Sequence, residues 1–446
     1  MRKTSDLIVI SDLHLAAERN CGLFRADSEL AEFLTWVYSE AKDSFLVLNG
    51  DIFDFLVGEN GGEITSLKES SQKAIKIIEN HPEVFDALAK ITNSNRHQLF
   101  ILGGNHDPEV ALPEVQAVFE DRLRLNNFSP NIRWLVSGNA LTVSVGKKCI
   151  LIEHGDLFDD WNRIDYGKLQ NSINYSSRLI ENDSYNAPPG SYLVENLNPL
   201  RKKYPWIDLL KPITEATFPL AWTFARQELN IEQRRMLQKV LLNGISAGTN
   251  WLKRNLIMTL HSEMILGDTY HHADLTDEFS VWRNQEINNP GTSTKKDLRK
   301  LIKQLKTVSE QDSSFAIEVP ERNKFKSDFL NKYIDSQQIS AVVHGHTHSA
   351  KIYLVKDGKG LYLNSGTWGR LLCLPNSKDS VESWEDFLVE LETGTDKGFL
   401  RPTFVRIKND SQTDVVHAGL NEWNNPVVTL ASWQIGSNSD TWKQEG

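Results

Sequence analysis

Short apolar runs alternate with amphipathic stretches over the first 160 residues of the chain. The runs are rich in Leu, Ile and Val and are bounded by turn residues, which is typical of buried strands. They occupy residues 7–10, 45–48, 99–102, 149–152 and, much later, 339–343. Apolar residues spaced by three and four predict helices around residues 30–37, 74–84 and 115–123. Strands that alternate with helices predict a layered α/β fold.

The pattern changes in the middle of the chain. Helical periodicity dominates residues 161–335, and strand-like runs return at residues 350–355, 360–363, 403–407 and 414–416. The simplest organisation is one α/β core, residues 1–160 and 336–420, interrupted by a mostly helical insertion, residues 161–335. Residues 421–446 are rich in Asn, Ser and Trp and show no period, so we interpret them as a C-terminal tail.

Composition narrows the class of protein. Hydrophobic residues make up 40% of the chain and charged residues 24%, as in ordinary soluble globular proteins. No apolar run approaches the ~20 residues of a membrane-spanning helix, and the N-terminus lacks the features of a signal peptide. The net charge of −10 argues against a broad basic surface for duplex nucleic acid, while short or single-stranded substrates stay open.

The cysteines indicate the compartment. Cys21, Cys149 and Cys373 are odd in number and far apart, so they predict neither a disulfide framework nor a zinc site. Buried thiols of this kind are typical of a reducing cytoplasm. We therefore expect a cytoplasmic protein.

Polar side chains follow each of the main apolar runs. In an open α/β sheet the carboxyl ends of the strands line one crevice where ligands bind, so we expect these side chains to converge. The residues at these ends are Asp12, His14, Asp51, Asp54, Asn105, His106, Asp107, His154, Asp156, His344, His346 and His348.

Several carboxylates in one crevice would repel one another or take up protons. A pair of divalent metal ions removes this conflict, and carboxylates with neutral imidazoles suit Mn, Fe or Zn. In extended segments, Asp12-Leu-His14 and His346-Thr-His348 would each place two ligands on one face. Each cluster by itself also fits a simple turn, so the prediction depends on their joint occurrence.

Together these motifs resemble the signature of the calcineurin-like metallophosphoesterases. The resemblance covers about residues 1–160 and 336–420 and implies a layered α/β-β-α sandwich. The motifs that carry it are Asp12-Leu-His14, Gly50-Asp-Ile-Phe-Asp54, Gly104-Asn-His-Asp107, His154-Gly-Asp156 and Gly345-His-Thr-His348.

The resemblance implies two divalent metal ions, Mn first, with Fe, Zn, Ni or Mg left open. The ligands of one metal would be Asp12, His14 and His348. The ligands of the other would be Asn105, His154 and His346. Asp51 would bridge the two metals, and Asp54 and Asp156 would support the geometry of the ligands.

His106 is the histidine that the resemblance leaves off the metals, close to the scissile phosphate and oriented by Asp107. A hydroxide held between the metals would attack phosphorus in line, and His106 would stabilise oxygen charge or protonate the leaving oxygen. We therefore expect hydrolysis of a phosphate-containing substrate at a phosphodiester or pyrophosphate bond. A nuclease or cyclic-nucleotide phosphodiesterase is the alternative. A non-catalytic scaffold on the same fold is a third reading, although it would be expected to have lost ligands.

Within the family, three motifs resemble the UDP-2,3-diacylglucosamine pyrophosphohydrolases, which also carry a helical lid. That group usually has Arg where this chain has His106, and its lid is much shorter, so the resemblance leaves the substrate open. The motifs are Asp12-Leu-His-Leu15, Gly50-Asp-Ile-Phe-Asp54 and Asn364-Ser-Gly-Thr-Trp368.

The insertion is predicted to cap the metals. Residues 295–306 form a basic amphipathic pattern, which predicts a solvated helix packed on the insertion, with peripheral contact to a membrane surface or a polyanion as the alternative. His271 and His272 are read as surface or core residues, with a reach into the active site as the alternative. The pattern predicts no oligomeric state.

Overall fold

A computed structural model of the chain contains two compact units. The first unit comprises Met1–Glu195, Glu318–Arg370 and Leu400–Gly446, and the second comprises Asn196–Ile317 and Leu371–Phe399. The structure describes residues 2–18, 23–41, 43–57, 67–125, 130–159, 162–178, 187–201, 203–210, 216–225, 228–231, 233–235, 299, 301–303, 305–306, 330–334, 339–394, 397–424 and 427–445.

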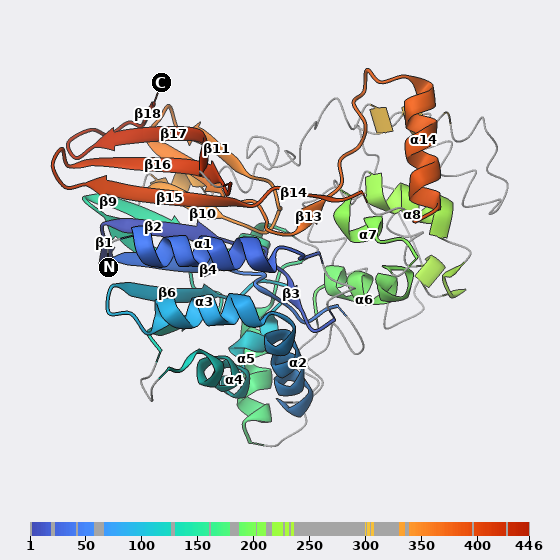
Figure 1. Ribbon diagram of the computed structural model, residues 1–446, viewed down its shortest axis with the longest axis horizontal. Helices are drawn as coiled ribbons and strands as arrows, with labels where there is room; N and C mark the ends of the chain where they lie inside the picture. The colour runs from blue at the N-terminus through green and yellow to red at the C-terminus, as the bar shows by residue number, and fades with distance from the viewer. Residues whose placement is uncertain are drawn as a thin grey trace. The chain divides into compact units, whose positions relative to one another are not determined.

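Two sheets form the centre of the first unit (Figure 1). In spatial order, the eight-stranded sheet contains β18 (Lys443–Gln444), β17 (Val428–Gly436), β16 (Val415–Glu422), β15 (Thr403–Asp410), β2 (Asp6–Ile10), β4 (Ser44–Asn49), β6 (His97–Leu102) and β7 (Ile132–Leu135). The six-stranded sheet contains β1 (Arg2–Thr4), β8 (Leu141–Val145), β9 (Lys148–Ile152), β10 (Ile339–His344), β12 (Gly360–Asn364) and β11 (Lys351–Val355). The short strands β3 (Leu15–Ala16) and β5 (Phe53–Asp54) pair with each other, as do β13 (Arg370–Leu371) and β14 (Phe399–Leu400).

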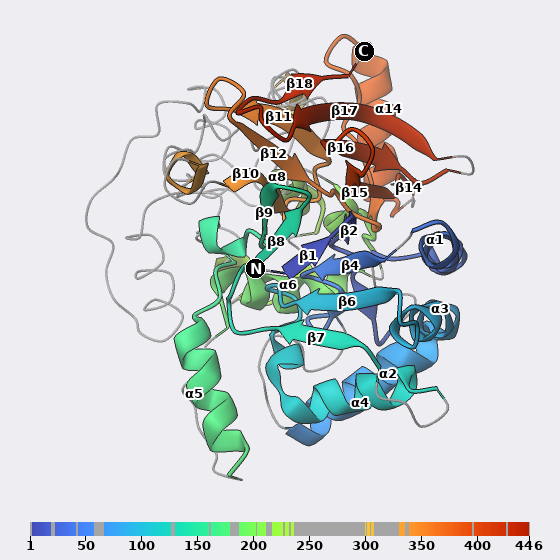
Figure 2. The same cartoon turned by 90° about the vertical axis from the view of Figure 1, so that its left-hand side faces the viewer.

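Side chains that alternate along the strands build the layers. In β2, Leu7 and Val9 pack in the core that contains Ile150 and Val343 of the other sheet, while Ile8 packs toward the helices. Because β2 is covered on both faces, its sequence is a continuous apolar run. Figure 2 shows α1 and α3 beside the eight-stranded sheet, on the side away from β8 and β9. The predicted layered α/β fold is confirmed.

Helices cover the outer face of the eight-stranded sheet. α1 buries Leu30, Phe33, Leu34 and Val37, the residues whose spacing predicts it. The structure gives bounds for α1 (Asp27–Glu40), α2 (Leu67–Asn80), α3 (Pro82–Thr92), α4 (Pro113–Leu123), α5 (Tyr166–Ser176), α6 (Pro189–Arg201), α7 (Trp206–Leu209), α8 (Phe218–Ala225) and α14 (Val381–Glu392), and for the short 3-10 turns η1 (Pro108–Ala111) and η2 (Asp156–Phe158).

The structure divides the helix predicted around residues 74–84 into two. α2 ends at Asn80 and α3 begins at Pro82. A proline ring disfavours the helical conformation of the residue before it, here His81, while suiting the first turn of a new helix. The apolar spacing continues across this break because both helices bury a face in the same core.

Residues 421–446 also differ from the sequence interpretation as a tail, since they contain β17, β18 and the end of β16. β17 pairs with β16 in antiparallel register and extends the eight-stranded sheet. Most side chains of β17 are partly buried, so its sequence lacks the clean alternation of a strand with one wet face.

The second unit combines helices from two distant parts of the chain. Trp206 of α7 is fully buried, and its indole N–H donates to the carbonyl oxygen of Leu391 in α14 at 2.7 Å. Residues 371–399, predicted as part of the core, therefore belong to this unit. In the described part of the basic segment, Leu301, Ile302 and Leu305 are buried, as expected for the apolar face of a packed helix. Residues 295–298, 300 and 304 of this segment lie outside the described residues. His271 and His272 lie outside the described residues.

None of the helices in the described part of the chain has the length and apolar character needed to span a membrane.

Candidate metal centre

The predicted site residues lie in the first unit, where strands β2, β4, β6, β9 and β10 end. The loop after β2 is tied to the loop after β4 by backbone hydrogen bonds from Asp12 N–H to Gly50 O at 3.1 Å and from His14 N–H to Asp51 O at 3.0 Å. Neighbouring parallel strands thus bring the two loops together at one edge of the sheet.

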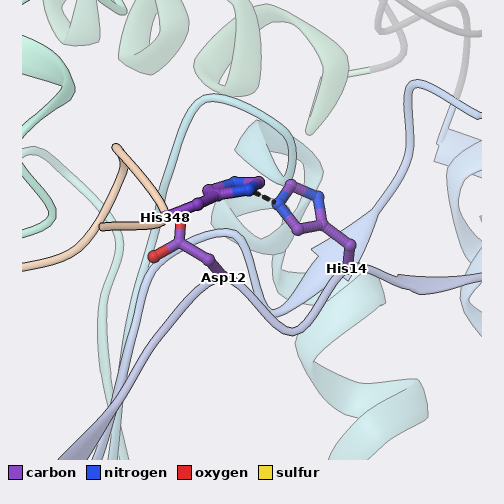
Figure 3. A group of neighbouring side chains, drawn as sticks. All are labelled: Asp12, His14 and His348. Carbon is purple, nitrogen blue, oxygen red and sulfur yellow. Dashed lines mark hydrogen bonds and ion pairs between the residues drawn. The ribbon is translucent and has the colours of Figure 1, made fainter. Parts of the chain in front are cut away.

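One group of ligand-type atoms comprises Asp12, His14 and His348. Their ligand atoms lie within 4.8 Å of one another, and all three side chains are buried. Figure 3 shows the three side chains turned toward one another, with Nε2 of His14 and Nε2 of His348 3.0 Å apart. Nε2 of His348 also lies 3.5 Å from Oδ1 of Asp12. A divalent cation fits this donor set of one carboxylate and two imidazoles.

A second group comprises Asp51, His154 and His346, with Nε2 of His154 3.2 Å from Oδ2 of Asp51. Within the described part of the chain, Oδ1 of Asn105 and Nδ1 of His346 are buried and have no hydrogen-bond partner. Buried polar atoms are rarely left in this state, and metal ligation would satisfy them. Asn105 stays a predicted ligand, supported by this unpaired Oδ1.

The backbone at the candidate ligands is unusual. Positive φ angles occur at Asp12 (53°), His14 (55°), Asp51 (51°), His346 (70°) and His348 (60°). Non-glycine residues rarely adopt this left-handed conformation, and such strain concentrates at functional sites. The expectation that Asp12-Leu-His14 and His346-Thr-His348 are extended is therefore wrong. Left-handed turns, rather than strand alternation, direct these side chains.

Asp51 and His154 of the second group shift each other's pKa in opposite directions. Burial alone would raise the pKa of Asp51, but His154 and His106 hold it well below its usual range. Burial would lower the pKa of His154, but Asp51 raises it well above its usual range. Both directions favour a carboxylate on Asp51 and a protonated imidazole on His154 in the metal-free protein. Because a ligating imidazole must be neutral, a metal held by His154 would displace that proton.

His106 and Asp107 have partners that differ from the expectation. The carboxylate of Asp107 accepts hydrogen bonds from the backbone N–H groups of Ile52 (2.9 Å), Phe53 (3.3 Å) and Gly104 (2.6 Å). It therefore stabilises the turn after β4, and the prediction that it orients His106 is corrected. Asp54 is the carboxylate that faces His106, with Oδ1 3.4 Å from Nδ1.

His106 is also the most solvent-accessible imidazole of the site. Its side chain is 18% exposed, against 0% for His14 and 7% for His348. Its backbone N–H donates to Oδ1 of Asp51 at 2.8 Å, so its position is coupled to the second group. An imidazole that is held by its backbone and partly exposed can reach a bound substrate.

The supporting carboxylates lie behind the ligands. Oδ2 of Asp54 lies 3.2 Å from Nδ1 of His14, which orients that ring as a metal-binding histidine requires. Asp156 is buried and accepts a long hydrogen bond of 3.4 Å from the backbone N–H of Ile164. His344 is buried against Glu153, with Nε2 2.9 Å from Oε1, and belongs to no ligand group in the described chain.

Two further residues support the site. Oδ2 of Asp159 lies 2.9 Å from Nε2 of His346, and nothing in the sequence distinguishes Asp159 from a loop residue. The side-chain amide of Asn364 donates to Gly345 O at 2.7 Å and to Oγ1 of Thr347 at 3.1 Å. Asn364 begins the Asn-Ser-Gly-Thr-Trp motif noted in the sequence. Its role is visible only in the fold, where these two hydrogen bonds hold the residues on either side of His346.

Gly104 is expected to be required at the second group. A Cβ added there would lie 2.3 Å from Oδ1 of Asp51 and 2.9 Å from Nε2 of His154. We expect Gly104→Ala to displace both side chains and to lower kcat about 100-fold, as misplacement by about 1 Å can do. Gly103→Ala is the matched control, because its Cβ would meet Val136 Cα at an ordinary 3.6 Å. Equal kcat values for the two variants would contradict this reading.

The buried carboxyl of Glu109 is expected to make the free energy of unfolding depend on pH. Burial raises the pKa of Glu109 to about 8, from 4.5. Between these two pH values the folded state retains a proton that the unfolded state loses. The stabilisation that comes from this protonated carboxyl is fully present below pH 4.5 and is lost as the pH rises through about 8. We expect Glu109→Gln to gain free energy of unfolding relative to wild type between pH 5 and pH 9, measured by urea unfolding of metal-free protein. Exposed Glu114→Gln serves as the control. Identical pH profiles for wild type and Glu109→Gln would contradict the expectation.

The chain also matches a known protein family over the region that carries most of these residues. A family model described as calcineurin-like phosphoesterase matches residues 6–216. Over these residues the chain is recognised as a calcineurin-like phosphoesterase. The match includes every candidate ligand except His346 and His348, which the structure brings to the same site.

One solved structure is similar to the chain at low identity, and it adds no support for the fold or the function. A crystal structure of a conserved uncharacterized protein from Streptococcus pneumoniae TIGR4, a predicted phosphoesterase, is similar at 10% identity over 94% of this chain and 89% of that chain, with a TM-score of 0.26. A likeness at that score adds no support for fold or function. No curated protein matches the chain.

As this match implies, the protein is a metal-dependent phosphoester hydrolase. Its substrate contains phosphate, and the groups of Asp and His side chains are the candidates for binding its divalent metal ions.

Proposed function

We propose that this phosphoesterase is a dinuclear enzyme that hydrolyses a phosphodiester or pyrophosphate bond in the cytoplasm. Mn²⁺ is the metal we assign first, with Fe, Zn, Ni or Mg as alternatives. Asp12, His14 and His348 would hold one ion. Asn105, His154 and His346 would hold the other, with Asp51 between them.

Two adjacent groups of buried carboxylates and imidazoles support this proposal. They are joined directly, because the backbone N–H of His346 lies 3.0 Å from both carboxylate oxygens of Asp12. The rings of His154 and His346 are 5.2 Å apart. Two sites this close fit a pair of ions at the ~3.5–4 Å separation of two-metal phosphoesterases.

Divalent ions in these groups would neutralise phosphate charge and lower the pKa of a water molecule. His106 would act on the substrate side. Burial would raise the pKa of Asp54, but His106 and His14 hold it below its usual range, so Asp54 remains an anion beside Nδ1 of His106. This charge favours the imidazolium form of His106, which can stabilise an equatorial oxygen or donate a proton to the leaving oxygen.

The alternatives differ in substrate or in catalysis. A nuclease or cyclic-nucleotide phosphodiesterase would use the same residues on a different phosphodiester. A non-catalytic scaffold would be expected to lack ligands or His106, yet every position is filled in this chain. The likeness of three motifs to the UDP-2,3-diacylglucosamine pyrophosphohydrolases supports a pyrophosphate, while His106 supports a wider choice.

A substrate panel tests the proposal. Protein loaded with Mn²⁺ would be assayed on bis-nitrophenyl phosphate, nitrophenyl phosphate, cyclic nucleotides, single-stranded DNA and UDP-sugar pyrophosphates. We expect higher kcat/KM on the diester or a pyrophosphate than on the monoester. Preference for DNA or cyclic nucleotides would support the alternative, and preference for the monoester would reject the bond assignment. Fewer than two bound metals per chain would reject the dinuclear centre.

A further inference from the structure

Asp159 lies outside every metal-ligand motif, yet its carboxylate contacts a proposed ligand. Oδ2 of Asp159 is 2.9 Å from Nε2 of His346. The side chain of His346 is 6% exposed and that of Asp159 is 26% exposed, so the contact is largely shielded from water. A charge-assisted hydrogen bond in this setting has more influence than one at an open surface.

The position of Asp159 is fixed by the turn that follows η2. Its backbone N–H donates to Asp156 O at 2.9 Å, and its carbonyl oxygen accepts from the N–H of Arg163 at 2.8 Å. Its Oδ2 also accepts from the side-chain amide of Asn162 at 2.7 Å. The carboxylate is therefore held in place before any ligand binds.

This carboxylate decides which nitrogen of His346 is available. With Nε2 donating to Asp159, the lone pair of the neutral ring lies on Nδ1. Nδ1 is the buried atom that has no hydrogen-bond partner within the described residues. The backbone N–H of His346 donates to Asp12. The ring packs edge-on against His154, and the contact with Asp159 adds a hydrogen bond to the ring itself.

We propose that Asp159 is a positioning residue for the second metal: it holds His346 in the tautomer and orientation that present Nδ1 beside Asp51 and His154. The inference rests on the proposed dinuclear centre. It makes Asp159, which lies just before the predicted insertion, specific for one of two metals that are otherwise bound by similar side chains.

Stepwise metal binding tests the role without relying on turnover. Metal-free wild type, Asp159→Asn and Asp159→Ala would be titrated with Mn²⁺ by calorimetry. Loss of a carboxylate that orients a metal-binding histidine typically weakens affinity ~10–100-fold. We expect a loss of that size in one binding step for Asp159→Ala, a smaller loss for Asp159→Asn, and the other step unchanged. Asp165→Asn is the matched control, because this nearby carboxylate caps α5 through the N–H of Lys168 and contacts no ligand group.

The outcomes separate this inference from the proposed function. If wild type binds two metals and Asp159→Ala binds both with unchanged affinity, the positioning role is overturned and the dinuclear centre stands. If both affinities and the free energy of unfolding fall together, Asp159 is only structural, which also overturns the role. If wild type itself binds fewer than two metals, the dinuclear centre fails and this inference fails with it.

Discussion

Asp51→Asn is expected to lose one bound metal and to lower kcat about 1,000-fold, which corresponds to about 4 kcal/mol of transition-state stabilisation. Asp51 is the carboxylate on which the site converges. Its Oδ2 lies 3.2 Å from Nε2 of His154, and its Oδ1 accepts the backbone N–H of His106 at 2.8 Å. The amide keeps the shape of the side chain, removes its charge and replaces one of the two acceptor oxygens with an N–H donor.

Loss of that charge also removes the partner of a buried imidazolium. Burial lowers the pKa of His154, and the charge of Asp51 is the main influence that raises it. In Asp51→Asn, His154 would therefore become neutral over more of the pH range, and the second group would bind a cation through fewer charged ligands. Metal content by mass spectrometry and kcat on a diester substrate measure the two effects.

The control is Asp121→Asn, the same chemical change on a side chain that is 71% exposed in α4. We expect two metals and wild-type kcat for this variant. Retention of both metals in Asp51→Asn would remove Asp51 from the bridging position. Loss of metal without loss of turnover would reject the dinuclear mechanism.

His106→Ala is expected to retain both metals and to lower kcat ~10²–10⁴-fold, the usual contribution of a positioned acid or base. The imidazole of His106 faces Asp54, and it is the backbone N–H, which truncation keeps, that donates to the proposed bridging residue Asp51. The side chain of His106 is also the more exposed partner of the pair with Asp54, at 18% against 2%. Truncation should therefore remove the proton donor and leave the ligands in place. Metal stoichiometry and single-turnover kinetics distinguish these effects.

His417→Ala is a suitable control, because it removes a 41% exposed imidazole that pairs with Glu445 in the eight-stranded sheet. We expect no change in kcat for it. Wild-type turnover in His106→Ala would exclude the residue from the chemistry. Loss of a metal in His106→Ala would instead place it among the ligands, as the group formed with His14 and Asp54 allows.

The partners of Asp107 and His106 are where the structure differs from the prediction made from the sequence. The sequence places Asp107 next to His106, which makes it the natural candidate to orient that ring. In the fold, the carboxylate of Asp107 turns toward the amides of Ile52 and Phe53, and Asp54 takes its place beside His106. Adjacent residues point in different directions at a turn, so proximity along the chain does not predict contact.

The sequence by itself determined where the buried strands lie and that acids and imidazoles follow them. Both features are local: a strand covered on both faces needs a continuous apolar run, and parallel strands place their carboxyl ends at one edge. The tertiary structure alone decided the left-handed backbone at Asp12 and His346, the contact between Asp159 and His346, and the place of β17 in the sheet. The contact shows the reason most clearly, because Asp159 and His346 are 187 positions apart in the chain and no local pattern could encode their meeting.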